Sequence, residues 1–179
     1  MKKVLVMLLL FLVPLNVFCK EDTFDTARSS IIVDLNSGRV LYENNADDVR
    51  LIASITKIMT CIIAIEEGDL DKEIKAGEEI LKMYGTSIYL ELNEKMKLID
   101  LLYGLMLRSG NDASVVIAKA VAGSEEDFVK MINKKAKEIG MTNTTFSNPH
   151  GLDEETKNYS TARDMAKLSR YAYKNKTYR

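Results

Sequence analysis

Two residues that could do covalent chemistry stand three positions apart in one apolar run. Ser54 and Lys57 belong to the stretch from Leu51 to Glu66. Residues i and i+3 share a helix face, so this hydroxyl and this amine should face each other. A serine becomes a strong nucleophile when a nearby base takes its proton, and a helix N-terminus favours developing negative charge. The pair is therefore a candidate activated serine, with Ser54 as nucleophile and Lys57 as base.

The run that contains this pair is apolar on nearly every side, although it includes the charged residue Lys57. Apolar residues recur at almost every step from Ile55 to Ile65, which predicts a helix buried all round and ended by Gly68. An ammonium in such a setting is costly, so it pairs, reaches solvent or loses its proton. Cys61 lies in the same helix and is expected to be a small core residue.

A second candidate site is the loop Arg108–Ser114, which joins two predicted helices, Leu98–Leu107 and Asp112–Ala122. It contains Ser109 and Asn111, with a glycine between them that allows a tight turn. A purely structural role is the alternative, in which Asn111 or Asp112 caps the second helix and Ser109 satisfies a helix end. Taken alone, the loop favours the structural role.

The remaining elements must position these two candidates. Ser30–Asp34 and Arg39–Glu43 flank a turn-forming Asn-Ser-Gly and predict a β-hairpin, which needs helices or further strands for support. Ser124 should cap a helix that Gly140 ends, and the last helix should begin within 160–164. Segments 85–89 and 94–97 suggest turns with short strands. The predicted order is a hairpin, then helices, with no later strands, over the sections 28–67, 68–158 and 160–175.

Composition excludes several classes of function. The chain has 179 residues, which is one domain's worth, and a net charge of −1 gives no reason to expect nucleic acid as a partner. The sequence contains no metal-ligand spacing and no phosphate-binding glycine loop, so we expect no metal and no cofactor.

The N-terminus has the pattern of a targeting signal. Lys2 and Lys3 precede an apolar run from Val4 to Val13, which is too short for a comfortable membrane span. We expect a signal peptide over 1–19, cleavage after Cys19 and export. Lipid attachment at Cys19 and an uncleaved anchor are the alternatives. If Cys19 is removed, Cys61 remains alone and no intrachain disulfide can form.

A Ser-x-x-Lys opening a buried helix, followed about fifty residues on by Ser-x-Asn, is the motif order of penicillin-recognising serine enzymes. At these residues the sequence resembles the D-alanyl-D-alanine carboxypeptidases, the low-molecular-weight penicillin-binding proteins. The resemblance is carried by the hairpin and by four strings, at 53–60, 100–113, 148–152 and 159–164.

The resemblance implies an α/β (α+β) fold of the β-lactamase/transpeptidase type. Residues 20–179 would be a partial penicillin-binding domain, with the hairpin and the helical region present and the remaining sheet strands missing. Ser54 would be acylated, Lys57 would take its proton, Ser109 would relay a proton to the departing D-alanine, and Asn111 would bind the substrate backbone. The implied partners are the peptidoglycan stem peptide ending in D-Ala-D-Ala and β-lactams as covalent inhibitors. The implied place is the cell envelope or the exterior, with any membrane anchor beyond Arg179.

The sequence departs from this family in one respect, because no Lys-Thr-Gly follows Asn111. The motif's strand supplies an oxyanion donor worth about 3–4 kcal/mol, and its loss would leave apolar surface exposed. A weakly binding module or a non-functional remnant is therefore the alternative. A serine β-lactamase is disfavoured, because no Glu-x-x-Leu-Asn follows Asn111. His150, the only histidine, is expected to be a packed turn residue rather than a catalytic one.

Overall fold

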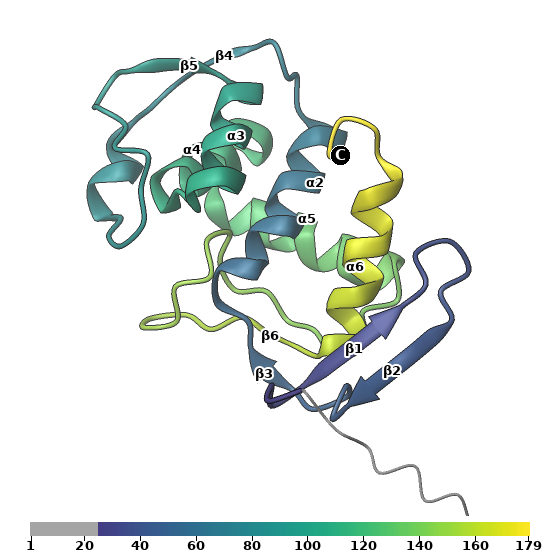
Figure 1. Cartoon of the computed structure of the whole chain (residues 1–179). Helices are drawn as coiled ribbons and strands as arrows, with labels where there is room; N and C mark the ends of the chain where they lie inside the picture. Colours follow the sequence, from purple (N-terminus) through teal and green to yellow (C-terminus); the bar gives the residue numbers. More distant parts are fainter. Residues whose placement is uncertain (1–24) are drawn as a thin grey trace, which may run out of the picture.

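The computed structural model describes residues 25–179 and begins with the expected hairpin (Figure 1). Strands β1 (Ser30–Val33) and β2 (Val40–Asn44) pair antiparallel. Gly38 adopts a φ of +78° in the connecting loop, which a glycine tolerates without strain. Helix α6 (Ala162–Lys174) supports the hairpin, and the Arg170 guanidinium donates to the Leu35 and Asn36 carbonyls at 3.1 Å each. The predicted hairpin is confirmed, and it packs on a helix.

The segment that carries Ser54 differs from the single helix predicted for it. After strand β3 (Arg50–Leu51), residues Ala53–Thr56 form the 3₁₀ turn η1, and the α-helix proper, α2, is Lys57–Glu67. Ala53 has a φ of 43°, which prevents a regular helix from starting before it. Ile55 is 48% exposed, so the prediction of burial all round is wrong at the start of the run. From Met59 to Ala64 burial is complete or nearly so, and the helix ends at Gly68 as predicted.

The other predicted helices are all present. They are α3 (Leu98–Arg108), α4 (Asn111–Ala122), α5 (Glu125–Glu138) and α6. Ser124 caps α5 by accepting from the Asp127 N–H, as its position in the sequence predicts. Thr161 caps α6 in the same way through the Asp164 N–H. A further 3₁₀ turn, η2 (Glu78–Lys82), precedes the segment that crosses α4.

Helix α2 lies between two apolar cores, which explains why its sequence is apolar on nearly every side (Figure 1). On one side Met59, Ile62 and Ile63 pack with residues of α5 and α6, including Phe128 and Leu168. On the other side Cys61 and Ala64 pack with residues of α3 and α4. Burial on both sides holds α2 in place. Lys57 is the first residue of α2, and Ser54 lies in the 3₁₀ turn directly before it.

The prediction of no strands after the hairpin is wrong. Strand β4 (Glu73–Lys75) pairs with β5 (Lys95–Lys97), and β3 pairs with β6 (Tyr159–Ser160), both antiparallel. These strands have two or three residues each, too few to show an alternating pattern in the sequence. Of the two segments where a short strand was suggested, 94–97 contains β5 and 85–89 contains none.

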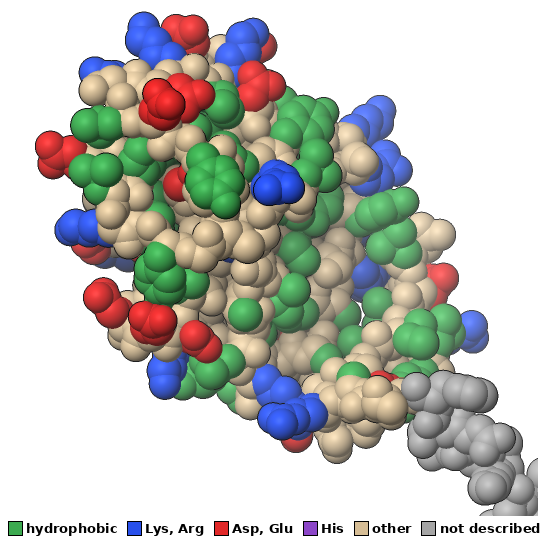
Figure 2. Space-filling view, turned by 60° about the vertical axis from the view of Figure 1, so that its left-hand side comes forward, with side chains coloured by type: hydrophobic (Ala, Val, Ile, Leu, Met, Phe, Trp, Pro, Cys, Tyr) green, Lys and Arg blue, Asp and Glu red, His purple; other side chains and the backbone are tan. Residues whose placement is uncertain are grey.

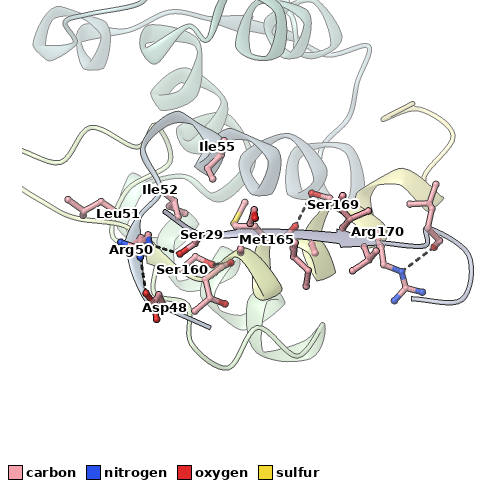
Figure 3. Close-up of a pocket in the computed structure, with 18 residues that line it drawn as sticks. Ser29, Asp48, Arg50, Leu51, Ile52, Ile55, Ser160, Met165, Ser169 and Arg170 are labelled. Carbon is pink, nitrogen blue, oxygen red and sulfur yellow. Dashed lines mark hydrogen bonds and ion pairs between the residues drawn. The ribbon is translucent and has the colours of Figure 1, made fainter. Parts of the chain in front are cut away.

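Apolar side chains are exposed in two regions of the described chain. Ile32 and Leu41 of the hairpin are each 55% exposed, and beside them a groove of about 660 Å³ lies between β1 and α6 (Figure 3). Arg50, Met165 and Ile55 line it. Elsewhere, Figure 2 shows hydrophobic side chains exposed among charged ones on one face. Within residues 25–179 no helix has the length and apolar character needed to cross a membrane. The predicted signal peptide, 1–19, lies outside the described residues.

Candidate active site

The amine of Lys57 is the centre of the site. Its Nζ lies 3.2 Å from Ser54 Oγ, 2.8 Å from Asn111 Oδ1 and 2.6 Å from the carbonyl oxygen of His150. An ammonium has three hydrogens, so all three are used in the charged form. The structure thus brings together three of the predicted site residues, Ser54, Lys57 and Asn111, although Asn111 lies 54 positions from Lys57. The fourth group, the His150 carbonyl, lies 93 positions away.

Burial changes the chemistry of this amine. Lys57 is 3% exposed, and no carboxylate among the described residues forms an ion pair with it. Desolvation disfavours the charged form and lowers the pKa of Lys57 from 10.5 to about 8. Ser54 itself is exposed, since the 3₁₀ turn carries its side chain out of the core. A partly neutral amine beside an exposed hydroxyl is what a base-activated serine requires.

Asn111 is held in one orientation by a neighbouring segment. Its Nδ2 donates to the Tyr84 carbonyl at 2.7 Å, which leaves Oδ1 as the acceptor facing Lys57. Its main-chain N–H donates to the Thr86 carbonyl at 2.9 Å. The structural alternative is wrong about the cap of α4, because the N-cap is Gly110, although the Asp112 carboxylate accepts from the Ala113 N–H at 2.8 Å within the first turn. Its other part is borne out, since Ser109 is the C-cap of α3 and its N–H donates to the Gly104 carbonyl.

Asp112 anchors the segment that fixes Asn111. Its carboxylate accepts from Ser87 Oγ at 2.5 Å and from the N–H groups of Ile88 and Leu90 at 3.1 and 3.0 Å. Burial alone would raise the pKa of Asp112, but these hydrogen bonds outweigh it and the pKa is lowered. Asp112 is therefore a charged, fully bonded support behind the site, a role that sequence reasoning missed.

Ser109 stands apart from the amine. It ends α3 in the left-handed conformation, with a φ of 56°, and its main-chain carbonyl accepts from Thr86 Oγ1 at 2.8 Å. Between residues 25 and 179 its hydroxyl has no hydrogen-bond partner, and it is part-exposed. Ser109 lies in the same loop as Asn111, but no hydrogen bond joins its side chain to Lys57.

The third group on Lys57, the His150 carbonyl, has no counterpart among the predicted site residues. It belongs to the turn-rich segment before β6, which also receives a bond from Thr60 Oγ1 to the Pro149 carbonyl at 2.6 Å. A main-chain oxygen leaves no side-chain signal in a sequence. The only available hint was the turn chemistry of Asn148-Pro-His-Gly, which marks a rigid loop but not its target.

The His150 ring is packed rather than reactive, in agreement with the sequence interpretation. It is 7% exposed, and its Nδ1 accepts from the Leu152 N–H at 3.0 Å. Its Nε2 faces Glu125 Oε1 across 3.7 Å. Desolvation, with the nearby charge of Lys57, lowers the pKa of His150 from 6.5 to about 4, so the ring stays neutral at pH 7.

The neutral ring predicts a loss of stability in mild acid. The pKa of His150 is 6.5 in the unfolded chain and about 4 in the folded chain, so the unfolded chain binds the proton first as pH falls. The contribution of the neutral ring to stability is therefore complete above pH 6.5 and is lost as pH falls through the window from 6.5 to about 4. The loss reaches about 3 kcal/mol below the window, since one pKa unit is worth about 1.4 kcal/mol. Urea unfolding at a series of pH values measures it. Carboxylates titrate in the same range, so the wild-type curve is compared with that of His150→Gln. Parallel curves would contradict the prediction.

Two other expectations concern the surroundings of the site. Burial raises the pKa of Cys61 to about 12, so its thiol stays protonated, as expected for a core residue. Across the described part of the chain, no cluster of His, Cys, Asp and Glu side chains could hold a metal ion.

Comparison with known proteins identifies the group to which this site belongs. The profile of the D-alanyl-D-alanine carboxypeptidase family, peptidase S11, matches residues 18–179. The D-alanyl-D-alanine carboxypeptidase DacF of Bacillus subtilis is 41% identical over 166 residues, which cover 87% of this chain and 42% of DacF. The chain therefore spans less than half the length of this curated relative.

Solved structures agree with the sequence match. A D-alanyl-D-alanine carboxypeptidase from Mycobacterium tuberculosis superposes with a TM-score of 0.82 at 30% identity, over 85% of this chain and 58% of that one. Penicillin binding protein 5 from Haemophilus influenzae gives 0.76 at 33% identity, over 83% and 45%. The predicted fold class is confirmed. Because the family profile matches nearly the whole length of this chain, the chain belongs to the D-alanyl-D-alanine carboxypeptidase family, the penicillin-binding serine peptidases.

Proposed function

We propose that the protein is an exported serine-type carboxypeptidase that removes the terminal D-alanine from peptidoglycan stem peptides and is acylated by penicillin. One observation carries the proposal: the buried Lys57 amine, whose pKa is lowered to about 8, lies 3.2 Å from the exposed Ser54 hydroxyl. The chain covers 42% of DacF, so the proposal concerns the activity, substrate and partners of the whole protein.

Acylation uses the neutral amine. Ser54 Oγ attacks the carbonyl carbon between the two D-alanines, and its proton passes to Lys57 Nζ. The tetrahedral intermediate collapses when the C–N bond breaks, and the departing amine takes the proton from Lys57 by way of the Ser109 hydroxyl, which leaves Lys57 neutral again. The products of this step are free D-alanine and an ester on Ser54. Water then attacks the ester, gives a proton to Lys57 and releases the shortened peptide with the Ser54 hydroxyl restored.

Two further groups act on the substrate. The Ser54 main-chain N–H is one oxyanion donor, with a second expected from a facing strand. Asn111 Nδ2 carries two hydrogens, of which the Tyr84 carbonyl takes one, so the other is available to the substrate backbone. The 179 residues contain no Lys-Thr-Gly, the motif that the resemblance to the carboxypeptidases implies as the binding element for the substrate carboxylate. A module that binds peptidoglycan or β-lactams and turns over little is the second candidate.

Intact mass spectrometry with benzylpenicillin separates these candidates. Attack by Ser54 opens the lactam ring, so the expected mass increase equals the whole β-lactam, and digestion should locate it on the peptide that contains Ser54. Reversible binding without a mass increase would support the module, and no binding would oppose both. Edman sequencing of the protein from its own cells tests export, with Lys20 expected as the first residue.

Acylation should also depend on pH through the base. The rate is expected to rise with pH as Lys57 loses its proton near its pKa of about 8. Below this value the rate should fall about tenfold per pH unit, following the neutral fraction. Stopped-flow acylation by benzylpenicillin measures the profile. A rate that stays flat from one unit below this pKa to one unit above would exclude Lys57 as the base.

A further inference from the structure

Two buried amides, Asn148 and Asn158, organise the loop that touches the reactive pair. They are 1% and 2% exposed. Asn148 Oδ1 accepts from the N–H groups of His150 at 3.2 Å and Gly151 at 2.6 Å. Its Nδ2 donates to the Leu152 carbonyl at 2.8 Å and to Thr156 Oγ1 at 2.8 Å. The Asn148 side chain therefore holds the peptide group that contains the His150 carbonyl, through its Gly151 N–H, and also the peptide group before it.

Asn158 joins this loop to the turn that carries Ser54. Its Oδ1 accepts from the N–H groups of Ser147 at 2.6 Å and Asn148 at 3.1 Å. Its Nδ2 donates to the Asn148 carbonyl at 3.0 Å and to Thr56 Oγ1 at 2.9 Å. Thr56 precedes Lys57 directly, so one amide connects the loop, its partner Asn148 and the start of α2.

The His150 carbonyl matters because of what a neutral amine can do. Such an amine has two hydrogens and one lone pair. The His150 carbonyl and Asn111 Oδ1 can only accept, so they take the two hydrogens of Lys57. The lone pair is then left in the third direction, toward Ser54 Oγ. If the carbonyl moved away, an N–H could turn toward the serine, and the lone pair would face elsewhere.

We propose that Asn148 and Asn158 are positioning residues of the Ser54–Lys57 pair, which fix the His150 carbonyl so that the Lys57 lone pair points at the nucleophile. The inference rests on the proposed function, because it assumes that Lys57 is the base. Neither amide touches substrate. Their effect passes through a main-chain oxygen.

A second consequence concerns the charge on Lys57. A carbonyl that accepts from an ammonium favours the charged form, so loss of the His150 contact lowers the pKa of Lys57 further. The titratable group that faces Lys57 from the loop is the His150 ring, which in turn faces Glu125 of α5 at 3.7 Å. His150 is neutral well below the pH range in which Lys57 titrates, so the two titrations are separable.

Asn148→Ala and Asn158→Ala in the full protein test the proposal through acylation by benzylpenicillin. The acylation rate constant is expected to fall about 10²-fold, the scale of an angstrom of misplacement, while the dissociation constant of the non-covalent complex is unchanged. The acid limb of the pH–rate profile should move to lower pH.

Asn133→Ala is the matched control. Asn133 is also an amide clamp on this connection, accepting from the Phe146 N–H at 3.0 Å and donating to the Phe146 and Val129 carbonyls at 2.7 and 2.9 Å. It holds the loop at Phe146, four residues before His150, and none of its side-chain hydrogen bonds reaches residues 147–152. Its removal should lower stability like the other substitutions but leave the pH–rate profile in place. Rates are compared per folded molecule, as counted by circular dichroism.

A titration of Lys57 by ¹³C NMR gives a readout that needs no turnover. The pKa of Lys57 should be lower in Asn148→Ala than in the wild-type protein and unchanged in Asn133→Ala. An unchanged pKa in Asn148→Ala, or rates and profiles equal to those of Asn133→Ala, would overturn the positioning role. A wild-type protein that is not acylated at Ser54 would instead overturn the proposed function, so the two failures are distinguishable.

Discussion

Replacement of Ser54 by alanine is expected to abolish covalent labelling by penicillin and all carboxypeptidase turnover. The Ser54 Oγ atom is the one that forms the ester in the proposed mechanism, and alanine has no oxygen to take its place. The substitution should leave the fold intact, because Ser54 is exposed and its hydroxyl makes one hydrogen bond, at 3.2 Å to Lys57. Exposed substitutions of this kind change stability by about 0.5 kcal/mol or less.

The measurement is intact mass after incubation with benzylpenicillin, with a urea melt of each variant. Ser37→Ala is the matched control, since Ser37 is an exposed serine in the hairpin loop that bonds to Asp34. It should be labelled like the wild-type protein. Labelling of Ser54→Ala at the wild-type rate would remove Ser54 from the role of nucleophile. An unfolded Ser54→Ala would show instead that the hydroxyl has a structural role.

Replacement of Gly151 by alanine is expected to damage both stability and acylation. A Cβ on Gly151 would lie 2.0 Å from the Ala53 carbonyl oxygen and 2.9 Å from the Ser54 nitrogen. These are backbone atoms and cannot move aside without moving the nucleophile. The overpacking should cost about 1–3 kcal/mol of unfolding free energy. Displacement of the Ser54 N–H, the proposed oxyanion donor, should lower the acylation rate about 10²–10³-fold.

Gly140→Ala separates this contact from backbone strain. Gly151 has a φ of +88° and Gly140 a φ of +80°, but no atom lies within 4 Å of a Cβ built on Gly140. Both variants therefore carry the strain of the left-handed region, and only Gly151→Ala adds the contact with residue 53. Urea unfolding and acylation kinetics are measured on both. Equal losses in the two variants would show that the approach of Gly151 to Ala53 has no effect on the nucleophile.

The sequence predicted most of the local structure correctly. The hairpin, the end of α2 at Gly68 and the cap of α5 by Ser124 follow from turn and capping residues within a few positions of each other. Strand β5 was suggested by the segment 94–97, whereas β3, β4 and β6 were missed because they form through pairing between distant segments, as between residues 51 and 159. The 3₁₀ turn at Ser54 was missed because the backbone of Ala53, rather than its residue type, breaks the helix.

By itself, the sequence determined the family and the candidates Ser54, Lys57, Ser109 and Asn111, because their motifs are short and depend on residue type and spacing. Only the tertiary structure decided which atoms surround the amine. Lys57 donates to the Asn111 amide oxygen and to the His150 carbonyl, while no hydrogen bond joins it to Ser109. The physical reason is separation along the chain. A contact between Lys57 and a main-chain oxygen 93 residues away depends on the packing of α2 and on two buried amides, and no local pattern encodes it.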